Sequence, residues 1–348
     1  MATNVSVAVG GQNWTAWVDA SVQYGAEQAA RHFSLTSTDG QTFANRWDFM
    51  PGTPVKVSEG GVILVTGIID KMTPSYSADA HSIAISGRSN SKDTIDSSVE
   101  HDTGEFRDKT ILDIANALDK QGVGFSSNLS TSDMPKIPYF RINPHETVFE
   151  AIDRIARKQQ LLLIGQADGG ILIDKGGSTS VNAPLIEGQN IECASACFDE
   201  SKKHSKYTCK GQKTKGSSKA DLQMMADAKD SSIKRNRPKT FSHESEVDQS
   251  DLQKRADNHR DRQFGESISA CIKVRDWRDA NGLAYKENSL IPVYSPMLKI
   301  QMAMIIAGVH CTKGEHGSFT ELTLKHPKAL GSKANAGSGA DAAWSPGF

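Results

Sequence analysis

The stretch Leu64-Val65-Thr66-Gly67-Ile68-Ile69 is the middle one of three short segments that decide the fold of the N-terminal part. Pro54-Val55-Lys56-Val57 precedes it and His81-Ser82-Ile83-Ala84-Ile85 follows it, and in each segment apolar residues recur with a period near two. This period is typical of strands with one buried face. Turn sequences separate the segments, with Pro51-Gly52 before the first and Glu59-Gly60-Gly61 before the second. We therefore predict three consecutive strands joined by tight turns.

A similar succession returns near the C-terminus, with a short insertion between its first and second segments. Its segments are Leu290-Ile291-Pro292-Val293, then Met304-Ile305-Ile306-Ala307-Gly308-Val309, then His316-Gly317-Ser318-Phe319-Thr320-Glu321-Leu322-Thr323-Leu324. Two copies of one pattern predict two similar β modules in one chain. A trimer of such chains presents six similar modules in a ring, an arrangement that joins a threefold assembly to a sixfold one.

Length and composition limit the number of domains and the classes of partner. The chain has 348 residues, enough for two or three domains with a sizeable core. Its net charge is −1 with 23% charged residues, so no overall field indicates nucleic acid or a membrane as partner. The N-terminal residues lack the basic start and apolar core of a signal peptide, and no apolar run reaches the length of a membrane span. Five cysteines do not form a disulfide framework in so long a chain, which indicates folding in a reducing cytoplasm.

The predicted fold class is mainly β with α+β, divided into four segments. Residues 1–98 are predicted to form a first β-barrel module, since many short strands follow at regular spacing. In residues 99–187 the apolar period changes to 3.6, which indicates a small α+β middle domain. Residues 188–330 are predicted to form a second β-barrel module with a polar, partly helical insertion at about 215–265. Residues 331–348 are predicted to be a flexible tail, in which Trp344 and Phe348 suggest a docking peptide.

Helices are predicted in the middle domain. The second of them has the best start signal in the chain, because Asn143 is able to cap it, Pro144 suits the first turn and Glu146 is placed for a capping box. In the first helix, which ends at Gly122, the predicted apolar face consists of Ile111, Ile114, Ala115 and Leu118. In the second helix the predicted apolar face consists of Val148, Phe149, Ile152, Ile155 and Ala156. This helix is predicted to run to about Gln159, with Arg157 and Lys158 in solvent.

Motifs for catalysis are incomplete. His145-Glu146 has the start of a zinc-protease helix, but Phe149 occupies the position of the second histidine, and His243-Glu244 fails likewise at Val247. No Gly-x-Ser-x-Gly elbow, phosphate loop or dinucleotide fingerprint occurs. A dispersed serine triad stays open at this point, but we expect a protein that is not an enzyme, with no catalytic and no cofactor-binding residue.

One cluster has the side-chain types of metal ligands: Cys193, Cys197, His204 and Cys209. A structural zinc site needs two close pairs of ligands, and only Cys193 and Cys197 are close enough to form one. Four residues apart, these two cysteines lie on one face of a strand, and we interpret them as buried small hydrophobic residues. We therefore expect no metal.

The densest basic run consists of lysines 202, 203, 206, 210, 213, 215 and 219. A basic stripe is the usual electrostatic footprint of nucleic-acid binding. Acidic residues flank the run, however, and Tyr207 is its only aromatic residue, so a solvated loop is the preferred interpretation. The sequence predicts a surface helix over Asp248–Phe264, ending at Gly265, after this run.

An ordered series of motifs runs through most of the chain. It begins at Ile83-Ala84-Ile85-Ser86-Gly87-Arg88-Ser89 with Asp93, Asp96 and Ser98, and continues through Ile137-Pro138, residues 146–156, residues 187–191, Gly211-Gln212, residues 235–238, Lys254-Arg255-Ala256 and the hairpin from Trp277 to Asn288. This series resembles the baseplate hub proteins of contractile-tailed, Mu-like phages. It departs from the common pattern at Lys286 and Asn236, where relatives often have an aromatic residue.

The resemblance implies a homotrimer with two tube-like barrels per subunit, similar to the T4 tail hub and to the hub part of type VI secretion spikes. Its implied partners are the tail tube protein, the central spike protein and other baseplate proteins, with DNA passing through a central channel without specific binding. Its implied place is the virion tail baseplate, assembled in the bacterial host cytoplasm. Two alternatives stay open: a tail protein that binds or cleaves peptidoglycan, and a DNA-contacting module that uses the Lys202–Lys219 run.

Overall fold

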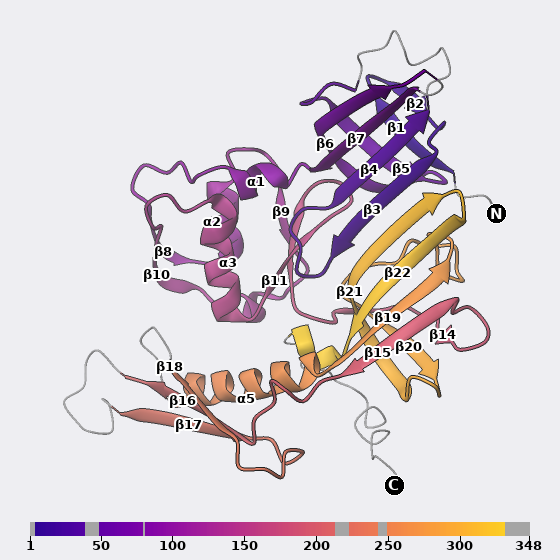
Figure 1. Cartoon of the computed structure of the whole chain (residues 1–348). Helices are drawn as coiled ribbons and strands as arrows, with labels where there is room; N and C mark the ends of the chain where they lie inside the picture. The colour runs from indigo at the N-terminus through magenta and orange to yellow at the C-terminus, as the bar shows by residue number, and fades with distance from the viewer. Residues whose placement is uncertain (1–3, 39–48, 79–80, 213–222, 243–248, 331–348) are drawn as a thin grey trace. The chain divides into compact units, whose positions relative to one another are not determined.

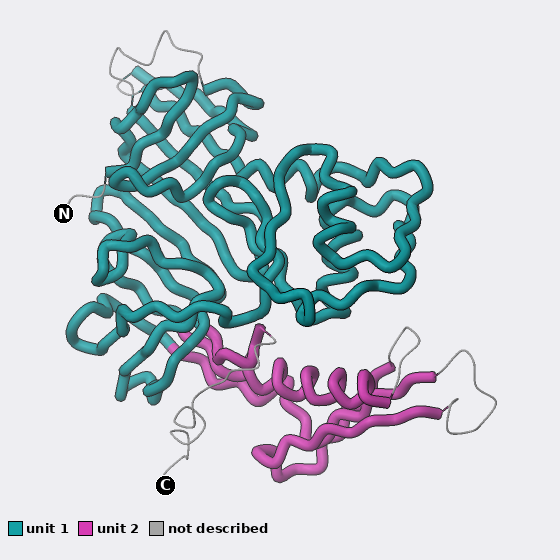
Figure 2. The backbone as a smooth tube through the Cα atoms, turned by 180° about the vertical axis from the view of Figure 1, so that it is seen from behind, with its two compact units in different colours: residues 1–195, 271–324 teal, residues 196–270, 325–348 magenta. Residues whose placement is uncertain are grey.

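A computed structural model describes residues 4–38, 49–78, 81–212, 223–242 and 249–330. The predicted tail therefore lies outside the described residues. The chain forms two compact units: residues 1–195 with 271–324, and residues 196–270 with 325–348 (Figure 2). Strands predominate over helices in the described residues, as the sequence predicts.

The N-terminal strands form the first β module (Figure 1). Its sheet order is β3-β4-β7-β6-β5-β1-β2. Alternate side chains are buried in most of these strands, which explains the period of two in the sequence. The strands are β1 (Val5–Val9), β2 (Gln12–Trp14), β3 (Asp19–Gly25), β4 (His32–Thr38), β5 (Pro54–Glu59), β6 (Val62–Tyr76) and β7 (His81–Ser89).

The C-terminal strands form the second β module with the same order of corresponding elements. Its order is β15-β19-β22-β21, with β20 also on β21, and β13 and β14 pair with β20. Both β6 and β21 have 15 residues, and both β7 and β22 have 9, so these corresponding strands also agree in length. The strands are β13 (Thr179–Ser180), β14 (Leu185–Ile186), β15 (Cys193–Phe198), β19 (Ile268–Arg275), β20 (Ser289–Ser295), β21 (Ile300–Gly314) and β22 (Gly317–Lys325).

The two glycines that mark the repeat in the sequence are not equivalent in the structure. Gly67 of β6 lies opposite Val55 of β5. Gly308 of β21 lies beyond the end of the β20 pairing and opposite Gly25 of β3. The repeat is therefore carried by strand order and length, and the glycines serve different close approaches.

The two modules do not form the separate, closed or nearly closed barrels that the sequence predicts. In the described residues their strands belong to one 14-stranded sheet, whose main path runs from β15 to β2. The modules join because β3 of the first pairs antiparallel with β21 of the second. Short-strand spacing in the sequence indicates many strands, but it does not reveal which edges meet.

The middle domain follows the first module and has its own core. Its two short sheets are β8 with β10, and β9-β12-β11. The helices α2 and α3 bury the apolar faces that the sequence predicts, and they contact each other. Its elements are α1 (Lys92–Asp96), β8 (Glu105–Lys109), α2 (Ile111–Leu118), β9 (Phe125–Ser127), the 3-10 helix η1 (Thr131–Asp133), β10 (Ile137–Arg141), α3 (Val148–Gln159), β11 (Leu162–Gly165) and β12 (Ile171–Asp174).

The predicted start of α3 is wrong by several residues. The Asn143 N–H does donate to Glu146 Oε2 at 2.9 Å, as in a capping box. His145, however, has a φ of +66°, which interrupts helical geometry. The helix instead begins after Thr147, whose side chain accepts from the Glu150 N–H while Glu150 caps the Thr147 N–H. The first helix similarly ends at Leu118, before the predicted Gly122.

The second compact unit packs a three-stranded sheet, β17-β16-β18, against a long helix. Tyr207, Cys209, Leu252 and Ala256 are fully buried in its core. The predicted surface helix extends one residue beyond Gly265, where a Cβ would lie 2.1 Å from the Ala329 nitrogen. Its elements are β16 (Lys206–Gly211), β17 (Met224–Lys229), β18 (Pro238–Ser242), α5 (Gln249–Glu266) and the 3-10 helix η2 (Pro327–Leu330).

We expect Ile152→Ala to lower the free energy of unfolding by about 2–5 kcal/mol, because it leaves a cavity at a fully buried site of α3. The measurement is urea denaturation followed by circular dichroism. Lys158→Ala, on the exposed face of the same helix, is the matched control and should change stability by less than about 0.5 kcal/mol. A loss that small for Ile152→Ala would mean that the buried face is wrongly assigned.

Candidate functional site

The backbones of the two β modules approach each other closely at their junction in the first compact unit. β3 and β21 pair over six residues of each strand, from Gly25 opposite Gly308 to Ala20 opposite Lys313. A Cβ on Gly25 would lie 2.7 Å from the Ala307 carbonyl oxygen, closer than real Cβ contacts allow. Glycine is therefore required where the two backbones approach.

Arg31, in the connection between β3 and β4, binds all three parts of this unit. Its Nη1 donates to the Leu64 carbonyl of β6 at 2.9 Å, and its Nε donates to the Gly165 carbonyl of β11 at 2.9 Å. Its Nη2 forms an ion pair with Glu287 of the second module at 2.5 Å. The side chains of Arg31 and Glu287 are only 8% and 1% exposed, so this pair is screened little by solvent.

Aromatic and thiol groups surround this ion pair. The guanidinium carbon of Arg31 lies 4.3 Å from the ring centroid of Tyr24, and the Tyr24 hydroxyl donates to the Tyr285 carbonyl at 2.7 Å. Burial, with the nearby Cys311 and Glu287, raises the pKa of Tyr24 well above its ordinary value. Tyr24 is therefore a neutral hydrogen-bond donor that ties the first module to the second.

A second contact joins the modules at a hairpin. Arg278 Nε lies 2.5 Å from Glu59 Oε2, and Arg278 Nη2 donates to the Glu59 carbonyl at 2.6 Å. A Cβ on Gly60 would collide with the Arg278 side chain at 2.3 Å. The connection after β19 is thus clamped to the turn between β5 and β6.

Arg88, in the motif that carries the family resemblance, links β6 and β7 to α1. Its Nε lies 2.9 Å from Asp70 Oδ2, and its Nη2 lies 2.7 Å from Asp96 Oδ2. Lys92 also pairs with Asp70. The hydrogen bond to Asp96 raises the pKa of Arg88, whereas bonds from Lys92 and Arg88 lower the pKa of Asp70 against the effect of its burial. These ion pairs hold β6 and β7 to α1, where the chain leaves the first module.

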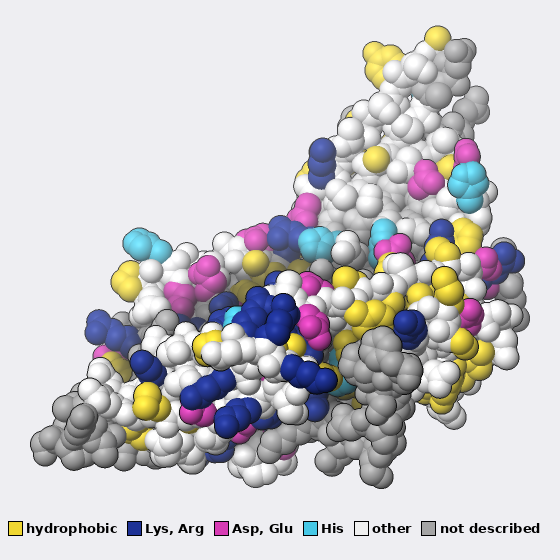
Figure 3. Space-filling view, turned by 60° about the horizontal axis from the view of Figure 1, so that its bottom comes forward, with side chains coloured by type: hydrophobic (Ala, Val, Ile, Leu, Met, Phe, Trp, Pro, Cys, Tyr) yellow, Lys and Arg dark blue, Asp and Glu magenta, His cyan; other side chains and the backbone are white. Residues whose placement is uncertain are grey.

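The described lysines of the predicted basic run do not form one exposed stripe. Lys206 pairs with Asp227 at 2.9 Å on the neighbouring strand, whereas Lys202 and Lys210 are exposed. Lysines 213, 215 and 219 lie outside the described residues. Figure 3 shows Lys and Arg side chains gathered on the surface of the unit formed by α5 and β16–β18, with acidic side chains among them.

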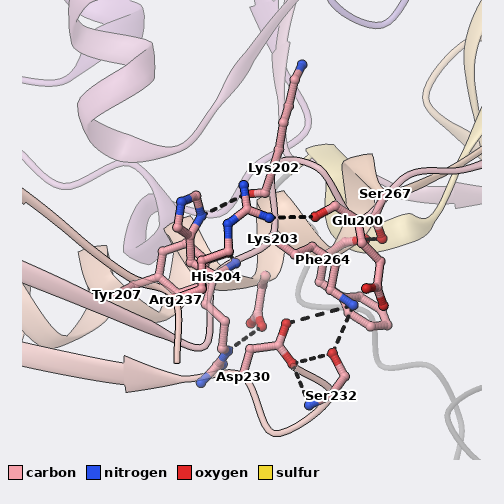
Figure 4. A network of polar contacts seen from close by, with 12 residues as sticks. Glu200, Lys202, Lys203, His204, Tyr207, Asp230, Ser232, Arg237, Phe264 and Ser267 are labelled. Atoms are coloured by element: carbon pink, nitrogen blue, oxygen red, sulfur yellow. Dashed lines mark hydrogen bonds and ion pairs between the residues drawn. The ribbon is translucent and has the colours of Figure 1, made fainter. Parts of the chain in front are cut away.

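Lys203 is the centre of a polar network in this unit (Figure 4). Its Nζ donates to Ser232 Oγ at 2.8 Å, lies 3.9 Å from Asp230 Oδ2 and lies 4.8 Å from the Phe264 ring centroid. Arg237 donates to the carbonyl groups of Glu200 and Ser201 in the same loop. Lys203 is only 3% exposed. It therefore stabilises the loops that lead into the sheet rather than presenting a charge to solvent.

The predicted metal-ligand types are not brought together. Cys193 and Cys197 are exposed, which corrects the expectation that they are buried, because β15 ends the path of the sheet. Cys209 is buried beside α5, and His204 Nδ1 lies 2.9 Å from the Lys202 carbonyl oxygen. In the described part of the chain, no group of three or more His, Cys, Asp or Glu side chains is arranged to hold a metal ion.

The incomplete protease motif has a structural role. Glu146 accepts hydrogen bonds from Arg154 Nε and Nη2, both at 2.8 Å. Burial alone would raise the pKa of Glu146, but the bonds from Arg154 and the Asn143 N–H lower it. His243 and Glu244 lie outside the described residues. Within the described residues, no helix is long and apolar enough to cross a membrane.

Family models match three consecutive parts of the chain. Residues 4–89 match the N-terminal domain of the Mu phage baseplate assembly protein GpP-like family. Residues 91–175 match the second domain of the gp44-like baseplate hub proteins, and residues 249–333 match the fourth domain of the Mu phage baseplate assembly protein GpP.

Similar proteins agree with these models. The baseplate hub protein of Escherichia phage Mu is 27% identical over 307 residues, which cover 84% of this chain and 79% of the relative. The crystal structure of the 43 kDa tail protein of prophage MuSo2 from Shewanella oneidensis has a TM-score of 0.84 at 26% identity, covering 94% of this chain and 99% of that one. A tail protein from Neisseria meningitidis MC58 shares the fold with a TM-score of 0.81 at 22% identity, covering 95% and 99%.

The joined β modules and these matches define the class of protein, a structural component of a phage tail. The chain belongs to the family of baseplate hub proteins of Mu-like phages. The resemblance seen in the sequence is thereby confirmed.

We expect Arg31→Ala to lower the free energy of unfolding by about 3–5 kcal/mol, because it leaves Glu287 buried without its cation. Urea denaturation measures the change. Arg157→Ala is the control, since this arginine is 76% exposed in its pair with Asp153 and should contribute less than about 1 kcal/mol. Equal losses for the two variants would contradict the role assigned to Arg31.

Thiol titration tests the cysteine assignments. After unfolding without reductant, all five cysteines should react, as expected for reduced thiols. In the folded protein, Cys209 and Cys311 should react at least about 100-fold more slowly, because both are buried and burial raises the pKa of Cys311 to about 12. Stoichiometric zinc in the purified protein, or fewer than five thiols, would contradict these assignments.

Proposed function

We propose that this chain is the trimeric hub that joins the sixfold tail tube to the threefold central spike. The proposal assigns residues 1–98 and 188–330 to the two ring-forming β modules and residues 99–187 to the middle domain. The observation that carries it is the shared strand order, β4-β7-β6-β5 in one module and β19-β22-β21-β20 in the other. Three chains then supply six similar modules around one axis.

The physical task of such a hub is to resist force without changing shape. Its partners are the tube protein, the spike protein and other baseplate proteins, and DNA passes through its central channel. The buried Arg31–Glu287 pair and the β3–β21 pairing support a rigid subunit. The related tail proteins are structural components, and we propose the same non-enzymatic role, in a virion baseplate assembled in the host cytoplasm.

One solved relative supports the connection to spikes. The Escherichia coli type VI secretion component c3393, described as similar to the T4 tail proteins gp27 and gp5, shares the fold with a TM-score of 0.59 at 10% identity. The alternatives of peptidoglycan cleavage and DNA binding have weaker support. Lys203 and Lys206 of the basic run are engaged in ion pairs.

The test is the mass of the purified protein in solution, measured by light scattering, together with negative-stain images. We expect a mass three times that of the 37.6 kDa chain and rings with a central opening. A DNA-binding assay over a series of salt concentrations separates the alternative, which predicts steeply salt-dependent binding. A monomer at high concentration would contradict the hub function.

A further inference from the structure

The junction within the chain uses one strand position from each module. In the first module, β3 lies beside β4 and contributes a strand to β21 of the second module. The position of β3 corresponds to that of β15 beside β19, and the position of β21 corresponds to that of β6. Among the described strands, the complementary pair, β15 with β6, is not made within the chain.

The second half of β6 has the edge that this pair requires. Ile68 lies opposite the first residue of β5, Pro54, and Ile305 is paired with Leu290 near the start of β20. Three residues further along each strand, Lys71–Tyr76 of β6 corresponds to Gly308–Lys313 of β21, the residues that bind β3. Among the described strands, this part of β6 pairs with β7 alone. Most of it is exposed, and Tyr76 is 86% exposed.

The composition of β15 is typical of a strand that pairs with another strand on each side. It is the end strand of its sheet in the described structure, and its sequence Cys193-Ala194-Ser195-Ala196-Cys197-Phe198 contains no charge. Five of its residues are exposed, and Phe198 is 44% exposed. Edge strands that stay free usually carry charges or other features that prevent pairing. An uncharged, apolar edge therefore indicates a surface that is covered in the assembly.

We propose that β15 of one copy pairs antiparallel with Lys71–Tyr76 of β6 in a neighbouring copy, repeating between subunits the β3–β21 junction within each. The inference rests on the proposed trimer and names the surfaces that close it. Pro74 cannot donate a backbone hydrogen bond, so the new ladder has at most one donor fewer than a regular one. The exposed rings of Tyr76 and Phe198 add apolar contact between the two copies.

Two exposed methionines lie where the Arg278–Glu59 contact would also be repeated between copies. Within the chain, the connection after β19 clamps the turn between β5 and β6 through Arg278 and Glu59. The corresponding turn between β20 and β21 presents Met297, which is 81% exposed, and the end of the connection before β5 presents Met50, which is 45% exposed. Repetition of the clamp between copies brings these two regions together.

Disulfide trapping with the native β15 cysteines tests the strand pairing. Thr73→Cys and Met72→Cys place a thiol on each face of β6, so one of them lies on the face that Cys193 and Cys197 share. Directly opposed strand residues have Cα atoms about 4.5–5.5 Å apart, which a disulfide spans. Mild oxidation of the full chain should give covalent dimers and trimers for one variant, detected on non-reducing gels and located by mass spectrometry.

Three controls make the result specific. The same variant with Cys193→Ser and Cys197→Ser should lose the cross-link, and Thr131→Cys, at an exposed position of η1, should give none. Phe198→Glu should raise the concentration needed for trimer formation at least tenfold, whereas Phe198→Leu should leave it within twofold. If the wild-type chain is a trimer but neither variant cross-links above the Thr131→Cys control, the strand pairing is wrong and the hub function stands. If the wild-type chain is a monomer, both are wrong.

Discussion

The contacts of Arg31 are the constraint on which the first compact unit depends. One guanidinium bonds to Leu64 of β6, Gly165 of β11 and Glu287 of the second module. A buried cation is costly unless it is paired and hydrogen-bonded, and Arg31 meets this requirement with groups from all three parts. Hydrophobic packing alone tolerates small shifts between parts, whereas a forked set of hydrogen bonds does not. Beside the backbone pairing of β3 with β21, Arg31 thus adds a directional link between the two β modules and the middle domain.

The shared strand order of the two β modules contrasts with the lengths of their connections. Corresponding strands have the same order, but their connections differ greatly. Ala26–Arg31 joins β3 to β4, whereas the whole sheet and helix of the second compact unit lie between β15 and β19. The short connection supplies Arg31 to the core of the subunit, and the long one carries charged side chains and α5. The short connection therefore stabilises the first compact unit, whereas the long one forms most of the second compact unit.

The lysine run in the sequence does not predict an exposed basic stripe in the structure. Successive side chains of a strand point to opposite faces, so Lys206 and Tyr207 lie on different sides of the same small sheet. Lys203, in the loop before this strand, is buried against Phe264 and Ser232. Density of lysines along the chain is thus a poor guide to charge density in space. The acidic partners, Asp227 and Asp230, come from a hairpin whose contribution is not apparent in the linear run.

The sequence by itself determined the predominance of strands, the buried faces of α2 and α3, and the family. These are properties of local periodicity and of motif order, which neighbouring residues specify. Only the tertiary structure decided that the modules share one sheet, that Glu287 and Arg278 face Arg31 and Glu59, and that Cys193 and Cys197 are exposed. It also moved the start of α3 from Asn143 to Thr147, because the positive φ of His145 ends the local capping pattern. Contacts between residues more than two hundred positions apart depend on which strand edges meet, and alternation along a strand is the same whichever neighbour its edge finally binds.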